Sequence, residues 1–292
     1  MDVEGFSNPW EHVRLLSDRG RNEALITLLE RHAPGNRVLE VGCGSGLLSC
    51  VAAKLGATRV YAVEPTAMAD TARELVRANG LGDVVQVLDG MVQDLPVHPV
   101  DFAFSELLNA QPYHEGVLPA MDGAASWLVD GGVLAPRRLR VWAALARDTG
   151  SSQESRRARS EVARIAEACG LECGPIVEAM GHAEVYPYLV DRVTVAGEPT
   201  LVHDLVLGRG LEPPTSCDVV CRGEPGPVDG VAIWFEAILD DELVLGNAPG
   251  TPGHWGHLVC SWPTEIPLRR DGSVTVRVTL DEDGLNAEPV VT

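Results

Sequence analysis

Two glutamates in the stretch FSELLNAQPYHEG, residues 104–116, are spaced so that they could act on one substrate. Glu106 and Glu115 lie nine positions apart. The preceding residues PVDFAF have the pattern of the end of a buried strand, so Glu106 comes where a strand stops and a loop begins. Two carboxylates on one loop suit a guanidinium, which is planar, carries five N–H donors and stays protonated at ordinary pH.

A glycine cluster, VGCGSG, lies earlier in the chain between a predicted strand and a predicted helix. Gly42, Gly44 and Gly46 are spaced G-x-G-x-G, whereas the dinucleotide fingerprint is G-x-G-x-x-G, so an NAD-type ligand is less favoured. Glu64 ends the next predicted strand, 22 residues after Gly42, where an acid accepts hydrogen bonds from ribose hydroxyls in folds of this kind. The cluster therefore predicts a site for a ligand with a ribose.

The elements that would position these residues alternate as in a doubly wound parallel sheet. Residues 37–65 read as strand, glycine turn, helix and strand. The alternation continues to the strand GGVLAP, before which Gly131 and Gly132 are expected to make a turn. Residues 1–34 carry apolar side chains at helical spacing, and Gly20 is expected to separate two helices.

The pattern changes after Pro136, and the sequence predicts an α/β protein of two domains. Residues 1–136 are expected to form a Rossmann-like domain with helices at its N-terminus. Residues 137–292 contain several short alternating segments separated by glycine and proline turns, which favour a β-barrel or sandwich. We expect a β-barrel substrate domain with a polar helical segment inserted at about 151–190.

Composition limits the partners. The chain has 292 residues, 45% hydrophobic and 22% charged, as in ordinary soluble globular proteins. The net charge of −19 repels nucleic-acid phosphates and attracts cations, so we expect a cationic substrate and no nucleic acid. No apolar run reaches the ~18 residues of a membrane span, and the first residues do not read as a signal peptide, so a cytoplasmic protein without a membrane partner is expected. The seven cysteines favour neither a disulfide framework nor a metal site.

The glycine cluster resembles the first motif of the S-adenosylmethionine-dependent methyltransferases. That motif is written E/D-x-G-x-G-x-G, and here it reads EVGCGSG with Glu40 as the acid. The resemblance implies S-adenosylmethionine as the cofactor, with Glu64 and the adjacent Pro65 at its ribose. LDGMVQDL is similar to the segment that holds adenine, which implies contacts from the main chain of Val92 and the amide of Gln93. The cluster residues that the resemblance places at the cofactor are Gly42, Cys43, Gly44 and Gly46.

Methyl transfer to a guanidine gives the two glutamates a specific task. An acceptor lone pair must lie in line with the sulfonium carbon, so the catalyst mainly positions two groups. One carboxylate could hold the guanidinium bidentately, while the other holds the reacting nitrogen and localises a lone pair. Glu106 and Glu115 resemble the double-E loop of the protein arginine methyltransferases, in separation and in place after the strand. The resemblance implies that both are catalytic and bind substrate, and that Glu106 also lies beside the cofactor.

The first helices resemble the same family. HVRLLSDRGR is similar to that family's H-x-x-M-L-x-D-x-x-R segment. The resemblance implies that His12 and Arg21 flank the cofactor and that Arg21 grips its carboxylate. Leu15 stands where the family has a methionine near the sulfonium, so it too is expected at the cofactor.

A segment near the C-terminus, TPGHWGH, resembles the family's Thr-His-Trp loop, with Gly253 in place of the threonine. The resemblance implies that His254 is catalytic, that His254 and Trp255 contact substrate, and that His254 pairs with Asp18 of the first helices. The helical segment near 151–190 resembles the arm through which two family members pair head-to-tail, which implies a homodimer.

The chain departs from the family on the acceptor side. Phe6 falls where one of the family's tyrosines closes over the arginine, and Asp2 falls at another, so the hydroxyls are missing; Phe6 is still expected to contact substrate. Inside the double-E loop the family's Trp-Met-Gly-Tyr run is replaced. The replacing residues are Leu107, Leu108, Asn109 and Ala110. The two glutamates that would hold a guanidinium, Glu106 and Glu115, are kept. The loop residues that would line a groove for a peptide are altered.

These residues predict an arginine N-methyltransferase whose acceptor is free arginine, another small guanidine or protein-bound arginine. The altered loop favours a small-molecule acceptor. An alternative keeps the cofactor and methylates an oxygen, carbon or other nitrogen nucleophile, for which His114 or His254 could act as base. A binding subunit without activity is a third hypothesis, and the complete cofactor motif and both glutamates count against it. The sequence leaves open how many methyl groups are added.

Overall fold

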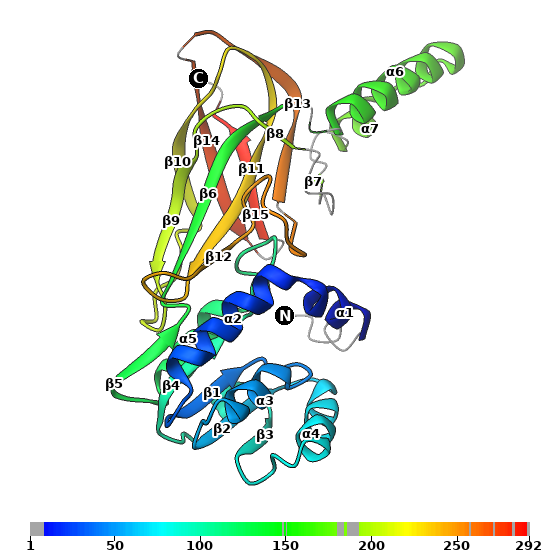
Figure 1. Cartoon of the computed structure of the whole chain (residues 1–292). Helices are drawn as coiled ribbons and strands as arrows, with labels where there is room; N and C mark the ends of the chain where they lie inside the picture. The colour runs from blue at the N-terminus through cyan, green and yellow to red at the C-terminus, as the bar shows by residue number, and fades with distance from the viewer. Residues whose placement is uncertain are drawn as a thin grey trace. The chain divides into compact units, whose positions relative to one another are not determined.

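The chain divides into two compact units, which the computed structural model describes over residues 9–147, 149, 151–179, 184–185, 193–256, 258–270, 272–281 and 284–290 (Figure 1). The first unit comprises Met1–Leu139, Asp204–Pro213 and Glu236–Gly246, and the second comprises Arg140–His203, Pro214–Phe235 and Asn247–Thr292. Two stretches of later sequence therefore belong to the first unit. Within the described ranges, no helix is long and apolar enough to cross a membrane.

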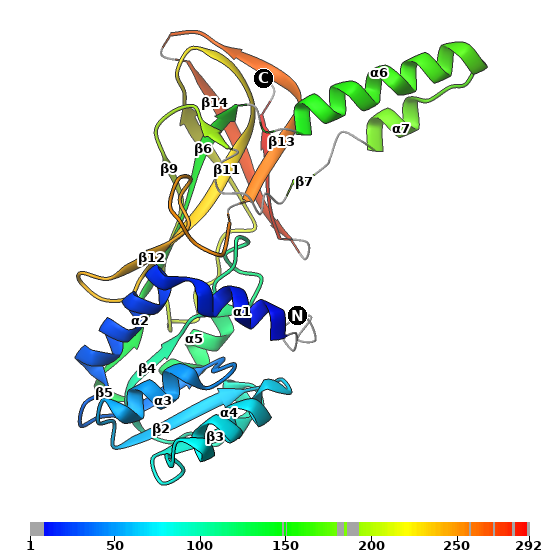
Figure 2. The same cartoon turned by 45° about the vertical axis from the view of Figure 1, so that its right-hand side comes forward.

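A parallel sheet forms the centre of the first unit. Its order is β3-β2-β1-β4-β5, and each neighbouring pair is parallel. Helix α3 contacts α4 (Figure 2). Helix α5 contacts the short 3-10 helix η2. The elements are β1 (Arg37–Val41), α3 (Leu47–Lys54), β2 (Arg59–Glu64), α4 (Met68–Ala78), β3 (Val85–Asp89), η2 (Val92–Asp94), β4 (Val100–Ser105), α5 (Val117–Ala125) and β5 (Leu128–Ala135). The predicted Rossmann-like fold of this part is confirmed.

The order of the strands reverses beside β1. The chain runs from β1 to β2 and β3 on one side and then returns to β4 on the other side. Val41, the last residue of β1, pairs with Ser105 at the end of β4 and with Val63 near the end of β2. The segments that follow these strands therefore leave the sheet side by side. In open α/β sheets, ligands bind outside the carboxyl ends of the strands at such a reversal.

The two central strands form a rigid base for this edge. Val38 and Leu39 of β1 and Val100 and Ala103 of β4 are fully buried. Parallel strands covered by helices on both faces read as nearly continuous apolar runs, as RVLEV and VDFAFS do. Each fully buried valine or leucine side chain stabilises the fold by about 1.5–3 kcal/mol, so these strands are held firmly in the core.

Two helices precede the sheet, α1 (Pro9–Ser17) and α2 (Arg19–His32). They are separated at Asp18, whose side chain accepts a hydrogen bond from the main-chain N–H of Arg21 at 3.0 Å and caps α2. The expectation that Gly20 separates the helices is wrong, because Gly20 lies inside the first turn of α2. An aspartate at the N-cap satisfies a helix N–H that has no partner within the helix, and this bond sets the break.

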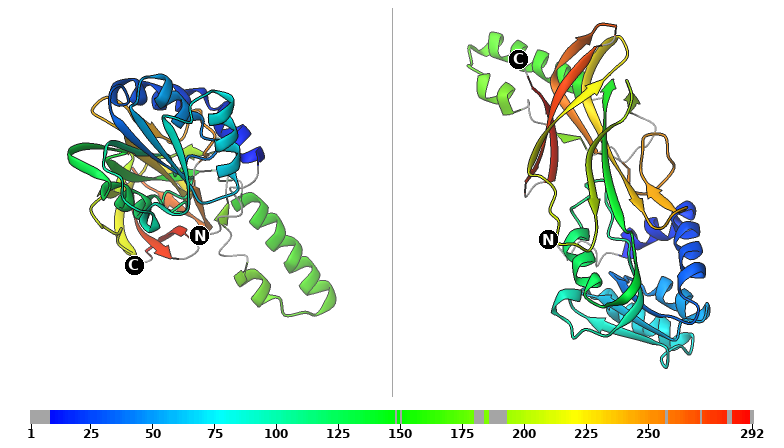
Figure 3. Two further views of the ribbon diagram at one scale, coloured as in Figure 1. Left: turned by 90° about the horizontal axis from the view of Figure 1, so that it is seen from below. Right: turned by 90° about the vertical axis from the view of Figure 1, so that its left-hand side faces the viewer.

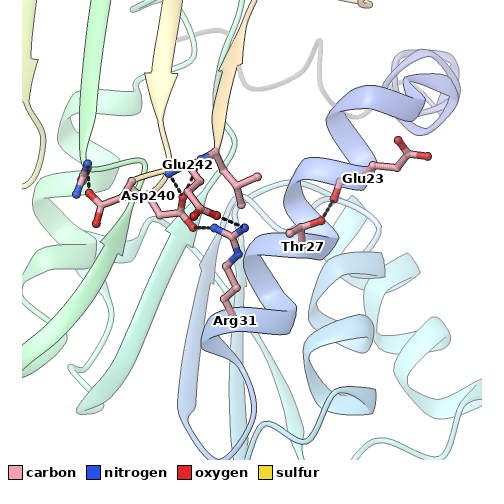
Figure 4. Close-up of polar contacts among 8 residues, drawn as sticks. Glu23, Thr27, Arg31, Asp240 and Glu242 are labelled. Carbon is pink, nitrogen blue, oxygen red and sulfur yellow. Dashed lines mark hydrogen bonds and ion pairs between the residues drawn. The ribbon is translucent and has the colours of Figure 1, made fainter.

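The C-terminal end of α2 contacts a turn of the same unit (Figure 4). Arg31 Nη1 donates to Asp240 Oδ2 and Arg31 Nη2 donates to Glu242 Oε2, each at 2.8 Å. Asp240 Oδ1 also accepts the main-chain N–H groups of Glu242 at 2.8 Å and of Leu243 at 2.7 Å. One carboxylate therefore shapes the turn and receives the arginine of the helix.

Gly131 and Gly132 lie inside β5 and not in a turn before it, which corrects the sequence-based expectation. Leu128 and Val133 pair with residues of β4 that are only two positions apart, so the register of β5 shifts between them. Gly131 has a φ of 79°, which L side chains rarely adopt. The predicted turn is therefore an excursion within the strand, of the bulge type that glycine permits.

Antiparallel pairing predominates among the strands after β5 and confirms the predicted barrel-like domain (Figure 3). One sheet has the order β10-β14-β15, and another has β7-β13-β11-β6-β8, with β12 paired to β11 and β9 to β6. The strands are β6 (Arg138–Arg147), β7 (Glu184–Val185), β8 (Thr194–Val195), β9 (Thr200–Val206), β10 (Ser216–Arg222), β11 (Gly226–Ile238), β12 (Val244–Gly246), β13 (Leu258–Leu268), β14 (Ser273–Asp281) and β15 (Gly284–Pro289).

The segment predicted to form a helical arm contains two helices, α6 (Ser151–Cys169) and α7 (Gly174–Ala179). They lie side by side in Figures 1 and 2, and α6 contacts β13. Between Ala179 and residue 190, only β7 belongs to the described residues. Among the side chains that the structure describes, no group of three His, Cys, Asp or Glu residues is arranged to hold a metal ion.

Candidate active site

Two loops meet at the edge of the sheet where the strand order reverses. The glycine loop (42–46) follows β1, and the glutamate loop (106–116) follows β4. A Cβ added to Gly42 would lie 2.7 Å from Cδ2 of Leu107, so the two loops are in direct contact. Gly42 also has a φ of 74°. Both observations explain the glycine, since any side chain at residue 42 would collide with the neighbouring loop.

Gly46 provides a second close contact, on the helix side of the glycine loop. It has a φ of 75° and is the N-cap of α3. A Cβ at this position would lie 2.8 Å from the Cβ of Ala72 in α4. The first N–H groups of α3 have no partners within the helix and carry partial positive charge, which favours electron-rich atoms of a ligand beside the loop.

Glu64 ends β2 beside the glycine loop and is buried. Its Oε2 accepts the main-chain N–H of Gly44 at 2.8 Å. Its Oε1 accepts the N–H and the hydroxyl of Thr66 at 3.0 and 2.6 Å. The carboxylate is thus fixed by its own surroundings at the place predicted for ribose recognition, and the adjacent Pro65 is exposed.

Glu40 lies within β1, below the glycine loop, and is also buried. Burial raises the pKa of Glu40 to about 8, although a hydrogen bond from the Ser49 hydroxyl and the charge of Arg21 act in the opposite direction. Burial likewise raises the pKa of the Cys43 thiol well above its usual value. A thiol in that state is a poor nucleophile, so Cys43 lines the loop without acting as a reactive cysteine.

Glu106 is held by a buried ion pair with Arg21 of α2. Arg21 Nε donates to Glu106 Oε2 at 2.5 Å, and Arg21 Nη2 pairs with the same oxygen. The side chains of Arg21 and Glu106 are 9% and 5% exposed. Arg21 Nη1 donates to Asn22 Oδ1 at 3.0 Å, and the Asp18 cap holds the main chain of Arg21. Charge-assisted hydrogen bonds of this kind are strong away from water, so both groups are well fixed.

Glu115 closes the glutamate loop just before α5. Asn109 Nδ2 donates to Glu115 Oε1 at 2.9 Å, and Asn109 Oδ1 accepts the main-chain N–H of Gln111 at 3.2 Å. Main-chain hydrogen bonds of 3.0 and 3.1 Å close two turns over 111–114 and 113–116. The loop therefore begins with one held carboxylate and ends with another.

The segment predicted to hold adenine forms η2. Val92 is buried, and a Cβ added to Gly123 of α5 would lie 2.6 Å from Val92 Cγ1. The Val92 side chain is thus committed to packing on α5, which leaves its main chain as the part that a ligand could use. Gln93 is exposed.

The N-terminal residues predicted for the site are described in part. Leu15 is half-buried on α1. His12 belongs to α1, but its side chain lies outside the described residues, and Phe6 and Asp2 lie outside them altogether. Their predicted contacts stay predictions.

His254 and Trp255 lie in the second unit. Their ring centroids are 4.4 Å apart, and the buried Trp255 meets Phe235 edge-on at 5.4 Å. Asn247 Nδ2 donates to the carbonyl of the neighbouring Gly256, which orders this loop. The predicted partner of His254, Asp18, belongs to the first unit, and that pair stays a prediction.

Comparison with known proteins decides the family. Residues 23–134 match the family of ribosomal protein L11 methyltransferases (PrmA). The chain is 30% identical to the arginine N(omega)-methyltransferase of Streptomyces achromogenes subsp. streptozoticus, over 95% of this chain and 80% of that protein. The chain belongs to the arginine N-methyltransferase family.

Other arginine methyltransferases match over nearly the whole chain. A probable protein arginine N-methyltransferase 6.1 of Oryza sativa subsp. indica is 27% identical over 96% of this chain and 84% of its own length. The crystal structure of protein arginine methyltransferase 10 from Arabidopsis thaliana has a TM-score of 0.82 at 25% identity, covering 98% of this chain and 95% of that one. The Trypanosoma brucei PRMT1 enzyme–prozyme complex with AdoHcy shares the fold, with a TM-score of 0.82 at 21% identity over 96% and 90% of the two chains.

As an arginine N-methyltransferase, the chain uses S-adenosylmethionine, and the first unit fits this cofactor. The glycine loop packs closely on Leu107 and Ala72, where only glycine fits at positions 42 and 46, and it brings the main-chain N–H groups at the start of α3 to the edge of the sheet. A buried carboxylate, Glu64, stands at the adjacent strand end for hydroxyl groups, and the guanidinium of Arg21 can pair with a carboxylate. The donors and acceptors thus match a ribose and an amino acid end.

Three polar side chains that hold the acids of the site escaped the sequence reasoning. Ser49 donates to Glu40, Thr66 to Glu64, and Asn109 to Glu115. The signal for Thr66 was its place in the turn after β2, because threonine hydroxyls in turns tend to hydrogen-bond to nearby groups. Ser49 and Asn109 act through helix and loop geometry that the spacing alone does not reveal.

Proposed function

We propose that this arginine N-methyltransferase transfers a methyl group to a guanidino nitrogen held by Glu106 and Glu115. The observation that supports the proposal most is the buried pair of Glu106 with Arg21. Glu106 already accepts two N–H groups from one guanidinium, at Nε and Nη2. The Arg21 pair fixes the orientation of the Glu106 carboxylate before a substrate guanidinium arrives, and bidentate contacts of this kind are those that guanidinium groups prefer.

S-adenosylmethionine, when bound, supplies a methyl group activated on a sulfonium. We propose that Arg21 grips its carboxylate, Glu64 and Pro65 lie at its ribose, and η2 presents Val92 and Gln93 to its adenine. His12 and Leu15 of α1 complete the pocket. The glycine-loop residues proposed at the adenosine and methionine parts are Gly42, Cys43, Gly44 and Gly46.

The glutamates do the chemistry by position and charge. Glu106 holds the guanidinium beside the cofactor, and Glu115 attracts the positive charge to the other nitrogens, so that the reacting nitrogen gains a lone pair. The reacting nitrogen loses its proton during or after transfer, and the proton passes to solvent, directly or through one of the two carboxylates. Fixing the two groups in line removes much of the entropic barrier, which is the main contribution that the protein makes. His254, Trp255 and Phe6 stay proposed substrate-binding residues on the resemblance of their motifs alone.

For the acceptor we favour a small guanidine, with free arginine first. Leu107 packs against Gly42, and Leu108 is buried, so neither presents the loop surface that a peptide groove needs. The relative at 30% identity is named arginine N(omega)-methyltransferase. Protein-bound arginine is the competing acceptor, and several relatives are named protein arginine methyltransferases.

We further propose a homodimer formed through α6 and α7. Ile165 on α6 and Ile176 on α7 are both exposed, as is Leu171 between them. Exposed apolar side chains grouped on one helical hairpin are typical of a contact surface. Sedimentation should give twice the mass of one chain, and Ile165→Glu with Ile176→Glu should yield monomers; monomeric wild-type protein would contradict the dimer.

Label transfer with product analysis tests the proposed reaction. The protein is incubated with S-adenosylmethionine carrying a labelled methyl group and with free arginine, a small guanidine or an arginine-rich protein. We expect label on free arginine, and mass spectrometry should place the methyl group on a guanidino nitrogen. Label on the arginine-rich protein alone would identify protein-bound arginine as the acceptor. Label on a phenol or other nucleophile, and on no guanidine, would contradict the proposal.

A further inference from the structure

Each glutamate of the loop has a hydrogen-bonding partner, and these two partners differ in charge. Glu106 is paired with the guanidinium of Arg21, whereas Glu115 Oε1 accepts a hydrogen bond from the neutral amide of Asn109 at 2.9 Å. A neutral donor restrains a carboxylate without cancelling its charge. Asn109 therefore restrains the Glu115 carboxylate without itself bringing a positive charge to it.

The amide of Asn109 is itself held in one orientation. Its Oδ1 accepts the main-chain N–H of Gln111 at 3.2 Å, which closes a turn of the kind that asparagine side chains commonly form. Because the oxygen faces a main-chain donor, the NH2 group is the end that faces Glu115. The direction of the Asn109–Glu115 bond thus follows from the backbone of the loop.

We propose that Asn109 is a positioning residue that presents the Glu115 carboxylate to the acceptor guanidinium, an inference that rests on the proposed function. A carboxylate oriented before the substrate arrives does not have to be ordered on binding, which lowers the entropic cost. Asn109 is also one of the four loop residues in which this chain departs from the double-E pattern. The loop thus carries its own means of orienting its second glutamate.

Asn109→Asp separates the hydrogen bond to Glu115 from the hydrogen bond that closes the turn with Gln111. The aspartate still accepts the N–H of Gln111, but it lacks the donor and sets a negative charge against Glu115. We expect kcat/KM for the acceptor to fall by about 10- to 100-fold, as for loss of a hydrogen bond to a charged group. Most of the loss should be in the acceptor KM, with the Kd for S-adenosylmethionine unchanged. Asn109→Ala, which removes both bonds without adding charge, should cost less.

Asn36→Asp is the matched control. Asn36 is half-buried in the same unit, and its Nδ2 donates to the carbonyl of His32 at 2.9 Å, away from both loops. The chemical change is identical, so general effects of a lost donor and an added charge appear here too. We expect wild-type kcat/KM for the acceptor.

The contact also has a readout that does not depend on turnover. In the double variant Asn109→Asp with Glu115→Gln, the new amide can donate to the new carboxylate, so the contact returns with opposite polarity. The urea midpoint of the double variant should therefore exceed that of Asn109→Asp alone. Independent effects of the two substitutions would mean that the side chains do not interact.

The outcomes separate this inference from the function on which it rests. Wild-type kcat/KM in Asn109→Asp, or additive midpoints in the double variant, would overturn the role of Asn109 while arginine methylation stands. If the wild-type protein binds S-adenosylmethionine but methylates no guanidine, the proposed function fails and the role of Asn109 fails with it. A selective loss in Asn109→Asp together with the restored midpoint supports the proposal.

Discussion

The glycine loop and the glutamate loop leave neighbouring strands of one sheet, yet they are built by different means. In the glycine loop the backbone sets the shape, through residues with positive φ and through main-chain N–H groups such as that of Gly44 on Glu64. In the glutamate loop, side chains reach other side chains, as Arg21 does to Glu106 and Asn109 to Glu115. A site made of backbone admits few substitutions, whereas a site made of side-chain pairs can change its substrate by changing a partner.

The largest effect in this comparison is expected from Glu106→Gln. The amide keeps an oxygen that can accept from Arg21, but it removes the negative charge that would hold the acceptor guanidinium. Turnover should fall by about 1000-fold, the upper range for loss of one electrostatic group in an active site. Label transfer gives the turnover, and calorimetry should show a change in S-adenosylmethionine affinity below tenfold, or about 1.4 kcal/mol.

Glu23→Gln is the control for this substitution, because Glu23 is a glutamate on the same helix α2 (Figure 4). It is exposed and pairs with Arg19. It should retain wild-type turnover. A Glu106→Gln protein that is folded, binds the cofactor and turns over like wild type would refute the role of the first glutamate.

The next largest effect is expected from Gly42→Ala, which tests the glycine loop, whose shape is set by the backbone. The new Cβ would lie 2.7 Å from Leu107 Cδ2, and the φ of 74° is unfavourable for alanine. Strain and collision of about 1–3 kcal/mol should distort the loop and weaken S-adenosylmethionine binding by roughly 10- to 100-fold in calorimetry.

Gly35→Ala controls for backbone strain alone. Gly35 has a φ of 75°, and a Cβ there would meet nothing within 4 Å. It should lower the unfolding midpoint but leave cofactor affinity intact. Equal losses of affinity in both variants would show that contact between the two loops does not matter.

A third test concerns Glu40, below the glycine loop, whose pKa burial raises to about 8. An acid with a higher pKa in the folded than in the unfolded protein binds more protons when folded, so its contribution to stability is full below about pH 4.5 and is lost as the pH rises to about 8. Glu40→Gln should remove this loss of folding stability at higher pH. The loss is at most about 1.4 kcal/mol per pH unit. Urea unfolding of both proteins at pH 6 and pH 8.5 checks it; parallel pH dependence in the two would be against a protonated Glu40.

The smallest effect is expected at Arg31, whose ion pairs with Asp240 and Glu242 lie at the far end of α2 from Arg21 (Figure 4). The Arg31 and Glu242 side chains are 36% and 75% exposed, and exposed pairs are typically worth less than about 1 kcal/mol. Arg31→Ala should lower the urea midpoint only slightly, less in high salt, and leave turnover unchanged. A large loss of turnover would mean that this end of α2 positions Arg21.

The two loops also differ in how far the sequence could predict them. The glycine spacing predicted a loop between β1 and α3, with Glu64 at the end of the next strand, because both follow from backbone geometry that recurs in the fold. The break between the first helices was predicted at Gly20 but lies at Asp18. The side-chain cap of Asp18 has a stronger effect than the weak helix propensity of one glycine. The contact of Arg21 with Glu106 spans 85 positions of sequence, and no local pattern reports it.

A crystal structure with S-adenosylhomocysteine and free arginine tests most directly whether the glutamate loop binds the acceptor. We expect the arginine guanidinium to contact the carboxylates of both Glu106 and Glu115, with one terminal nitrogen facing the cofactor sulfur. An arginine bound elsewhere, or a guanidinium that touches neither carboxylate, would contradict the proposed site.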